Sequence, residues 1–306
     1  MTGERIGFIG LGSMGAPMAE RLLAAGKDLV VCDPGPAQVA RLVARGARQE
    51  HTARAVADSA EIVLSCLPTV AAGREVALGA AGVAQGRAIQ AYVDLSTMGM
   101  KAAVEIAREL PAHIAFVDSP VSGGPPGARA GTLTTMASGR REHFERVLPV
   151  LSIIAQKVFF VGERPGQAQI AKLINNHLSA AGRLATFEGL VLALKAGLDL
   201  RKLIDVINVS SGRNSTTTDK VPAAILSGTF EFNGRLAISI KDQTLLREEA
   251  EALGVPLWVA PQLLAILEEA AASGYREKDS MLLLQYMGER AGMDVRALIA
   301  AQSNEL

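Results

Sequence analysis

The stretch Arg5-Ile-Gly-Phe-Ile-Gly10-Leu-Gly12-Ser-Met-Gly15 decides the fold class of this 306-residue chain. A short apolar run, Ile6–Ile9, leads directly into the pattern G-x-G-x-x-G, and helical spacing of apolar residues follows. In a strand–turn–helix unit these glycines allow a tight turn, close approach of the backbone to a pyrophosphate, and close packing of helix on strand. The N–H groups at the helix start favour an anion at the same place. The alternative is a glycine-rich turn without a ligand.

The alternation of strand and helix continues to about residue 161. The strand-like runs are Ile6–Ile9, Leu29–Cys32, Ile62–Cys66, Tyr92–Leu95, Phe116–Asp118, Thr134–Ala137 and Val158–Val161. This alternation predicts βαβ units and a doubly wound, mostly parallel sheet. After Gly166 the strand signals stop, and Gln167–Lys195 has the pattern of one long helix, with further helices beyond it. We therefore expect an α/β Rossmann-type domain over residues 1–163 and an all-α domain over residues 164–306.

Composition excludes several classes of function. Lys and Arg number 31 and Asp and Glu number 31, and this neutral balance argues against a protein whose main task is to bind nucleic acid. Cys32 and Cys66 cannot form a disulfide framework, and we expect reduced thiols. The chain shows neither a signal peptide nor an apolar run long enough to span a membrane. We therefore expect a cytoplasmic protein with no metal site and no membrane partner.

The second strand ends in Asp33, 18 positions after Gly15. A carboxylate at about this distance from the glycines typically accepts a hydrogen bond from the ribose 2′-hydroxyl of a dinucleotide. The same carboxylate repels a 2′-phosphate, so Asp33 favours NAD over NADP. The alternative role for Asp33 is to cap the next helix, ahead of Pro34.

Two later strands also end in loops on this side of the sheet, and ligands of doubly wound sheets bind at carboxyl ends of strands. Leu67, Pro68 and Thr97 in these loops are therefore candidate cofactor contacts, although ordinary turns would look the same. Further on, the stretch Asp118-Ser-Pro-Val-Ser-Gly-Gly-Pro-Pro-Gly-Ala-Arg-Ala-Gly131-Thr-Leu-Thr contains four glycines and could form a loop whose backbone N–H groups bind an anion. A flexible connection is the alternative.

Polar residues follow one face of the long, otherwise apolar helix. Lys172 and Asn176 are four residues apart, and Ser179 and Arg183 continue the stripe. Buried polar groups need partners, and a buried lysine can serve as a general base. The alternative is a solvated stripe on an edge helix. His177 lies off this face, and we expect a packed or surface histidine there.

These motifs together resemble one known family. Gly-Phe-Ile-Gly-Leu-Gly-Ser-Met-Gly, Asp-Ser-Pro-Val-Ser-Gly-Gly, Lys-Leu-Ile-Asn-Asn and Ile-Lys-Asp, in this order, are similar to the β-hydroxyacid dehydrogenases. This family includes 3-hydroxyisobutyrate dehydrogenase and tartronate semialdehyde reductase, and 6-phosphogluconate dehydrogenase is a larger relative. The resemblance implies hydride transfer between a nicotinamide cofactor and a β-hydroxyacid or its semialdehyde.

The resemblance also implies roles for single residues. Lys172 would be the catalytic acid/base, and Asn176 would orient the substrate with Asn175 nearby. The substrate carboxylate would be held by Ser122, Gly123 and Gly124. Thr97 and Lys241 would lie beside the nicotinamide. The cofactor set is then Gly10, Leu11, Gly12, Ser13, Met14, Gly15, Asp33, Leu67, Pro68, Thr97 and Lys241.

Three departures leave the substrate open: Ala168 replaces a glycine that the family often has, Met100 replaces a proline, and the late glycine motif is altered. One rival function is an imine or other carbonyl reductase on the same scaffold, but those enzymes usually lack the lysine. Another is a non-catalytic NAD-binding interaction module, which the neutral charge and the Lys172–Asn176 pair disfavour. The long apolar helix favours a homodimer or homotetramer.

Overall fold

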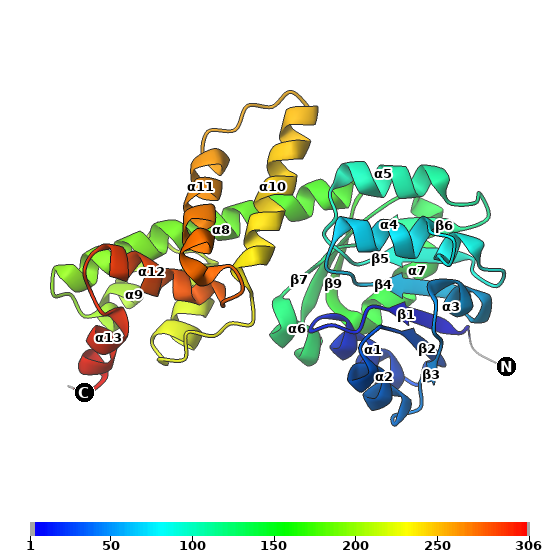
Figure 1. Cartoon of the computed structure of the whole chain (residues 1–306), viewed down its shortest axis with the longest axis horizontal. Helices are drawn as coiled ribbons and strands as arrows, with labels where there is room; N and C mark the ends of the chain where they lie inside the picture. The colour runs from blue at the N-terminus through cyan, green and yellow to red at the C-terminus, as the bar shows by residue number, and fades with distance from the viewer. Residues whose placement is uncertain (1–3, 305–306) are drawn as a thin grey trace. The chain divides into compact units, whose positions relative to one another are not determined.

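The computed structural model describes residues 4–304 and forms two compact units, one ending at Leu173 and one beginning at Ile174. The long helix α8 (Gln167–Lys195) begins in the first unit and continues into the second (Figure 1). It has the bounds that the sequence pattern predicts. The domain boundary predicted between residues 163 and 164 stays a prediction.

The first unit is built on one sheet. Its strands are β1 (Ile6–Ile9), β2 (Leu29–Cys32), β3 (Arg48–Gln49), β4 (Ile62–Ser65), β5 (Ala91–Asp94), β6 (Ala115–Asp118), β7 (Val121–Ser122), β8 (Leu133–Ser138) and β9 (Ala155–Gly162). The strand order is β3-β2-β1-β4-β5-β6-β8-β7, with β9 paired to β8. Strands β1 to β6 pair in parallel, whereas β8 is antiparallel to β6 and β7. The chain order reverses between β1 and β4, and ligands of such sheets bind at this switch point.

Helices cover both faces of this sheet. They are α1 (Gly15–Ala24), α2 (Pro36–Val43), α3 (Ala53–Ser59), α4 (Val70–Leu78), α5 (Met100–Glu109), α6 (Gly124–Ala130) and α7 (Arg141–Ile154), with a 3₁₀ turn at Val83–Gln85. Successive strand residues point to opposite faces, so in β4 Ile62 and Leu64 join the core cluster that includes α1 and α7, while Val63 joins the cluster under α3 and α5. The predicted doubly wound architecture is confirmed.

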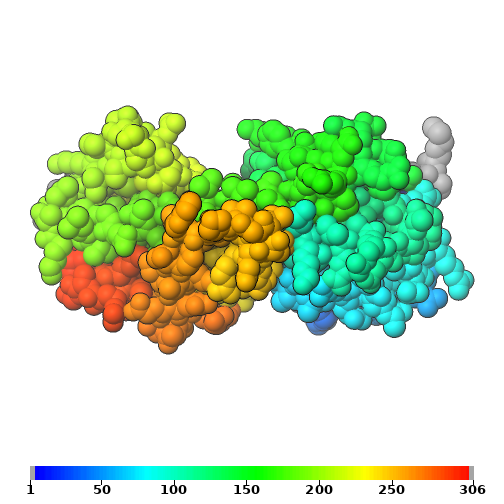
Figure 2. Space-filling view, turned by 90° about the horizontal axis from the view of Figure 1, so that it is seen from above, coloured from blue at the N-terminus to red at the C-terminus, as the bar shows by residue number. Residues whose placement is uncertain are grey.

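The second unit is helical. After the second part of α8 it contains α9 (Leu200–Asn208), the π-helix η2 (Thr216–Ile225), α10 (Leu236–Ala252), α11 (Ala260–Ala270), the short helices η3 (Ala271–Tyr275) and η4 (Ser280–Leu282), α12 (Leu283–Arg290) and α13 (Val295–Asn304). They enclose a separate apolar core. Figure 2 shows the red C-terminal helices against the light-green segment around α9, where Gln302 hydrogen-bonds the backbone of Leu198 and Leu200. Within residues 4–304, no helix has both the length and the apolar character of a membrane span.

Candidate active site

The three glycines of the turn after β1 differ in why they lack side chains. Gly10 has φ +90°, and a side chain there would collide with the backbone of Cys66, while one at Gly15 would collide with Gly10 itself. The protein's own packing therefore requires both glycines. A side chain at Gly12 would instead enter open space. Packing within the protein therefore does not require a glycine at position 12. A glycine there fits the close approach of a ligand to the backbone.

Asp33 holds this turn from the end of β2. Its two carboxylate oxygens accept hydrogen bonds from the N–H groups of Leu11 and Gly35, each at 2.6 Å. The next helix, α2, begins at Pro36 with Gly35 at its N-cap and has no side-chain cap, so the alternative role of Asp33 as its cap is wrong. A carboxylate has about four acceptor positions, so the oxygens can also accept from a ribose hydroxyl. Asp33 can therefore hold the turn within the protein and still bind a ribose.

The loops after β4 and β5 are joined through one buried carboxylate. Asp94, at the end of β5, is fully buried, and its Oδ1 accepts from the hydroxyls of Ser65, at 3.0 Å, and Ser96, at 2.6 Å. The Ser96 hydroxyl in turn accepts from Leu67 N at 2.9 Å. The structure thus brings two predicted cofactor contacts, Leu67 and Thr97, onto loops that share one anchor.

The stretch around Ser122 differs from the predicted loop. Val121–Ser122 is the short strand β7 against β8, and the helix α6 begins at Gly124. The prediction of an open glycine-rich loop is therefore wrong. Gly123 and Gly124 have φ +127° and +62°, which is the backbone conformation that lets the chain turn directly from strand into helix. Ser122 is half-buried at this turn.

The start of α8 is anchored to the sheet by Asp118. Its Oδ1 accepts from Gly166 N at 3.0 Å and from the Ser138 hydroxyl at 2.7 Å, and Ser138 accepts from Ala168 N at 2.8 Å. These bonds satisfy N–H groups that a helix start leaves without partners. Burial raises the pKa of Asp118 to about 7, against the effect of these hydrogen bonds, and Asp94, its register partner on β5, adds to the rise.

Gln169 joins α8 to the loop that carries Thr97. Its Oε1 accepts from Met98 N at 3.0 Å and Gly99 N at 3.3 Å, and its Nε2 donates to Ser96 O at 3.1 Å. The side chain is fully buried. The sequence analysis did not identify Asp94, Asp118 or Gln169 as site residues. The one signal in the sequence was for Gln169, because an amide on an otherwise apolar helix is expected to be buried and to need partners.

Lys172 lies one turn beyond Gln169 and is only 7% exposed. The solvated stripe that we considered as an alternative is thus wrong for Lys172, and also for Arg183, which is 6% exposed. A buried polar group of this kind needs polar partners, so Lys172 is part of the packed interior of the protein.

In the second unit, Asn176 is held from α10. Its Nδ2 donates to Asp242 Oδ2 at 2.6 Å, and Asp242 also pairs with Lys241 Nζ at 3.1 Å. Asp242 is almost fully buried. On α8, the exposed Asn175 donates from its side chain to Asn176 Oδ1 at 3.2 Å. The ion pair therefore fixes the amide of Asn176, a role for Asp242 that the sequence did not show. His177 contacts Gln243, as expected for a packed histidine.

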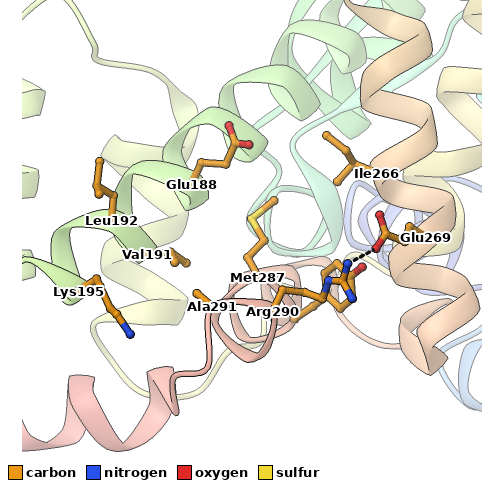
Figure 3. Close-up of a pocket in the computed structure, with 10 residues that line it drawn as sticks. Glu188, Val191, Leu192, Lys195, Ile266, Glu269, Met287, Arg290 and Ala291 are labelled. Atoms are coloured by element: carbon orange, nitrogen blue, oxygen red, sulfur yellow. Dashed lines mark ion pairs between the residues drawn. The ribbon is translucent and has the colours of Figure 1, made fainter.

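A pocket of about 470 Å³ opens in the second unit between α8, α11 and α12 (Figure 3). Its walls are mostly apolar, with an ion pair between Arg290 and Glu269 at 3.3 Å on one side. None of the predicted site residues lines it. Within residues 4–304, Cys32 and Cys66 form no disulfide bond.

Comparison with known proteins agrees with this arrangement. Residues 5–162 match the family model described as the NAD binding domain of 6-phosphogluconate dehydrogenase, and residues 166–287 match that described as NAD-binding of NADP-dependent 3-hydroxyisobutyrate dehydrogenase. The chain is 33% identical to 2-(hydroxymethyl)glutarate dehydrogenase of Eubacterium barkeri over 95% of this chain and 97% of that protein.

Solved structures share the fold over nearly the whole chain. The 3-hydroxyisobutyrate dehydrogenase of Mycobacterium tuberculosis with L-serine has a TM-score of 0.84 at 30% identity, covering 93% of this chain and 99% of that one. The protein Psf3 in complex with NADP+ and 2-OPP has a TM-score of 0.81 at 26% identity, covering 92% and 99%. With both halves matched by the family models and in the predicted order, the chain belongs to the β-hydroxyacid dehydrogenase family.

Proposed function

We propose that this oxidoreductase transfers a hydride between NAD and a small β-hydroxyacid, or its semialdehyde, with Lys172 as general acid/base. The observation that carries the proposal is the buried lysine one helical turn before an amide that an ion pair holds in place. The nicotinamide ring supplies the hydride acceptor or donor. The substrates in the names of the relatives, 3-hydroxyisobutyrate and 2-(hydroxymethyl)glutarate, define the class of hydroxyacid to be tested.

The residues of the chain would divide the work as follows. The turn from Gly10 to Gly15 binds the pyrophosphate with its backbone N–H groups, and Asp33 accepts from the ribose. The neutral amine of Lys172 takes the proton of the substrate hydroxyl during oxidation, and the ammonium returns it during reduction. Asn176 orients the hydroxyl, while Ser122 donates to the substrate carboxylate.

We favour NAD over NADP because Asp33 places negative charge where a 2′-phosphate would lie. The hydrogen bonds from Leu11 N and Gly35 N hold this carboxylate in place. Psf3, which shares the fold, is in complex with NADP+, so the two cofactors must be compared directly.

The test is a steady-state assay of nicotinamide absorbance with a panel of β-hydroxyacids and both cofactors. Lys172→Ala should lower kcat by about 10²–10⁴, the usual contribution of positioned proton transfer, while NAD binding in calorimetry stays near wild type. Lys172→Arg should fail too, because guanidinium does not act as a base near neutral pH. Lys195→Ala removes an exposed lysine from the last turn of the same helix and serves as the control.

Retention of most kcat by Lys172→Ala would remove the lysine from the mechanism. An absence of turnover with every hydroxyacid, combined with normal NAD binding, would favour the non-catalytic binding module. A higher kcat/KM with NADP than with NAD would overturn the role of Asp33.

We also propose that the chain forms a homodimer or homotetramer. Leu178 and Leu192 on α8 are 65% and 71% exposed, and Trp258, between α10 and α11, is 82% exposed. Apolar side chains of this size are commonly covered in an assembly. Sedimentation velocity decides the state, and a monomer at micromolar concentration would contradict the proposal.

A further inference from the structure

The polar stripe of α8 continues beyond Asn176 into a group of cations in the second unit. Ser179 follows Asn176 by three residues, and Arg183 follows Ser179 by four, so the three share one face of the helix. Lys220, from the π-helix η2, reaches this face and donates from Nζ to the Ser179 hydroxyl at 2.8 Å. A second hydroxyl, Ser215, lies 3.5 Å from the same nitrogen.

The positive charge of this group lacks a matching carboxylate. Arg183 is 6% exposed and donates to the hydroxyls of Ser239 and Ser280, at 2.8 and 3.2 Å, while its buried Nε has no hydrogen-bond partner within residues 4–304. Over the same part of the chain, neither Arg183 nor Lys220 has a carboxylate within 4 Å. Burial, and then the charge of Arg183, lower the pKa of Lys220 to about 8.

The acidic residues near this group are occupied elsewhere. Asp279 favours the charged form of Arg183, yet its oxygens accept from three backbone N–H groups, those of Phe232, Gly234 and Met281. Asp219, next to Lys220, is exposed to solvent, and its charge offsets only part of the fall in the pKa of Lys220. Asp242 is paired with Lys241 and Asn176. Two desolvated cations side by side are unfavourable unless an anion completes the group.

The place of this group along α8 indicates which anion it receives. Ser179 lies about 4.5 Å further along the helix axis than Asn176, at 1.5 Å per residue. A substrate whose hydroxyl is oriented by Asn176 can therefore reach Ser179 and Lys220 with a short side arm. We infer that Lys220 and Ser179 bind a second carboxylate of the substrate, so that the enzyme prefers hydroxy diacids to hydroxy monoacids.

This inference rests on the proposed function, since it extends the same substrate site. Lys220 supplies an ammonium and Ser179 a hydroxyl, and together they can make two hydrogen bonds to one carboxylate. Arg183, too deeply buried to reach solvent, raises the local positive potential. A hydrogen bond to a charged group of this kind is worth about a tenfold to hundredfold change in affinity.

The first experiment compares kcat/KM for a β-hydroxy diacid and for the β-hydroxy monoacid of equal chain length. Wild type should prefer the diacid. Lys220→Met should lose about tenfold to a hundredfold with the diacid, mainly through KM, and change little with the monoacid. Lys220→Arg should restore part of the preference, because it keeps the charge. Lys202→Met removes an exposed lysine of α9 and should leave both substrates unaffected.

The second experiment does not depend on turnover. Isothermal titration with glutarate and with butyrate measures binding of a diacid and a monoacid that carry no hydroxyl to oxidise. Glutarate should bind wild type and Lys202→Met more tightly than Lys220→Met, and butyrate should not distinguish them. This result would support the carboxylate site even if no hydroxyacid were oxidised.

Equal losses with diacid and monoacid in Lys220→Met would overturn the inference while the proposed function stands. The same conclusion follows if wild type oxidises both substrates equally well and binds glutarate no better than butyrate. A failure of Lys220→Arg to recover any diacid preference, with its fold intact by circular dichroism, would also contradict a role that depends on charge.

Discussion

Replacement of Gln169 by leucine should markedly destabilise the first unit. Leucine has a similar volume but no amide, so Met98 N, Gly99 N and Ser96 O would lose their partner. All three residues are buried, as is Gln169 itself. A buried polar group left without a partner costs about 1–3 kcal/mol. For three such groups we expect the free energy of unfolding to fall by at least about 3 kcal/mol.

Two measurements test this value. Urea unfolding followed by circular dichroism gives the loss of stability, and hydrogen exchange at Met98 and Gly99 shows whether their N–H groups have become open to solvent. Gln167→Leu is the matched control, since Gln167 lies two residues away and its side-chain Oε1 accepts from Arg164 N in an exposed bond of 3.0 Å. This control should change the free energy of unfolding by less than about 1 kcal/mol.

The Gln169→Glu variant makes the test sharper. A protonated carboxyl offers one donor and one acceptor, as the amide does, whereas a carboxylate cannot donate to Ser96 O. The folded protein therefore favours the protonated form and raises the pKa of the new group above its unfolded value. The variant should be nearly as stable as wild type at low pH, and lose stability as the pH rises from about 4.3. Wild-type stability and exchange protection in Gln169→Leu would refute the reasoning.

Two further predictions concern residues on strands of the sheet, Ser122 on β7 and Asp118 on β6. Ser122→Ala should raise KM for acid substrates by about tenfold, the value of one hydrogen bond to a carboxylate, with a smaller change in kcat; a loss confined to kcat would assign Ser122 to the transition state instead. The second prediction concerns pH: folded Asp118 keeps its proton up to a pKa of about 7, whereas the unfolded chain releases it earlier. The free energy of unfolding of wild type should therefore fall as the pH rises from about 4 to 7. Asp118→Asn has no such proton and should show a smaller fall. Urea midpoints across this pH range would show parallel curves for the two proteins if that interpretation of Asp118 were wrong.

The sequence predicted the elements whose signal is local. Strands Ile6–Ile9 and Leu29–Cys32 and the helix Gln167–Lys195 have their predicted bounds, because apolar runs and helical spacing are properties of neighbouring residues. The segment after Ser122 was predicted to be a loop because it is rich in glycine. It forms α6 because Gly123 and Gly124 make the turn into the helix, and proline is tolerated in a first helical turn.

The buried polar contacts could not be predicted, because they join residues far apart in the chain. Gln169 and Met98 are 71 positions apart, and Gly166 and Asp118 are 48 apart. The π-helix that carries Lys220 has no sequence pattern of its own. A single sequence can show that a polar residue on an apolar helix needs a partner, but it does not show which loop or strand supplies that partner.

The polar residues along α8 show what the need of buried polar groups for partners reveals about this helix. Gln169, one turn before the stripe, contacts the loop after β5, whereas Asn176 contacts α10 and Ser179 contacts η2. A solvated stripe would need no such contacts, whereas a buried one must satisfy each group separately. Substitution of one partner should therefore change the function of one position along the stripe and leave the helix itself intact. This separation is what makes the Lys220 and Gln169 variants independent tests of specificity and of stability.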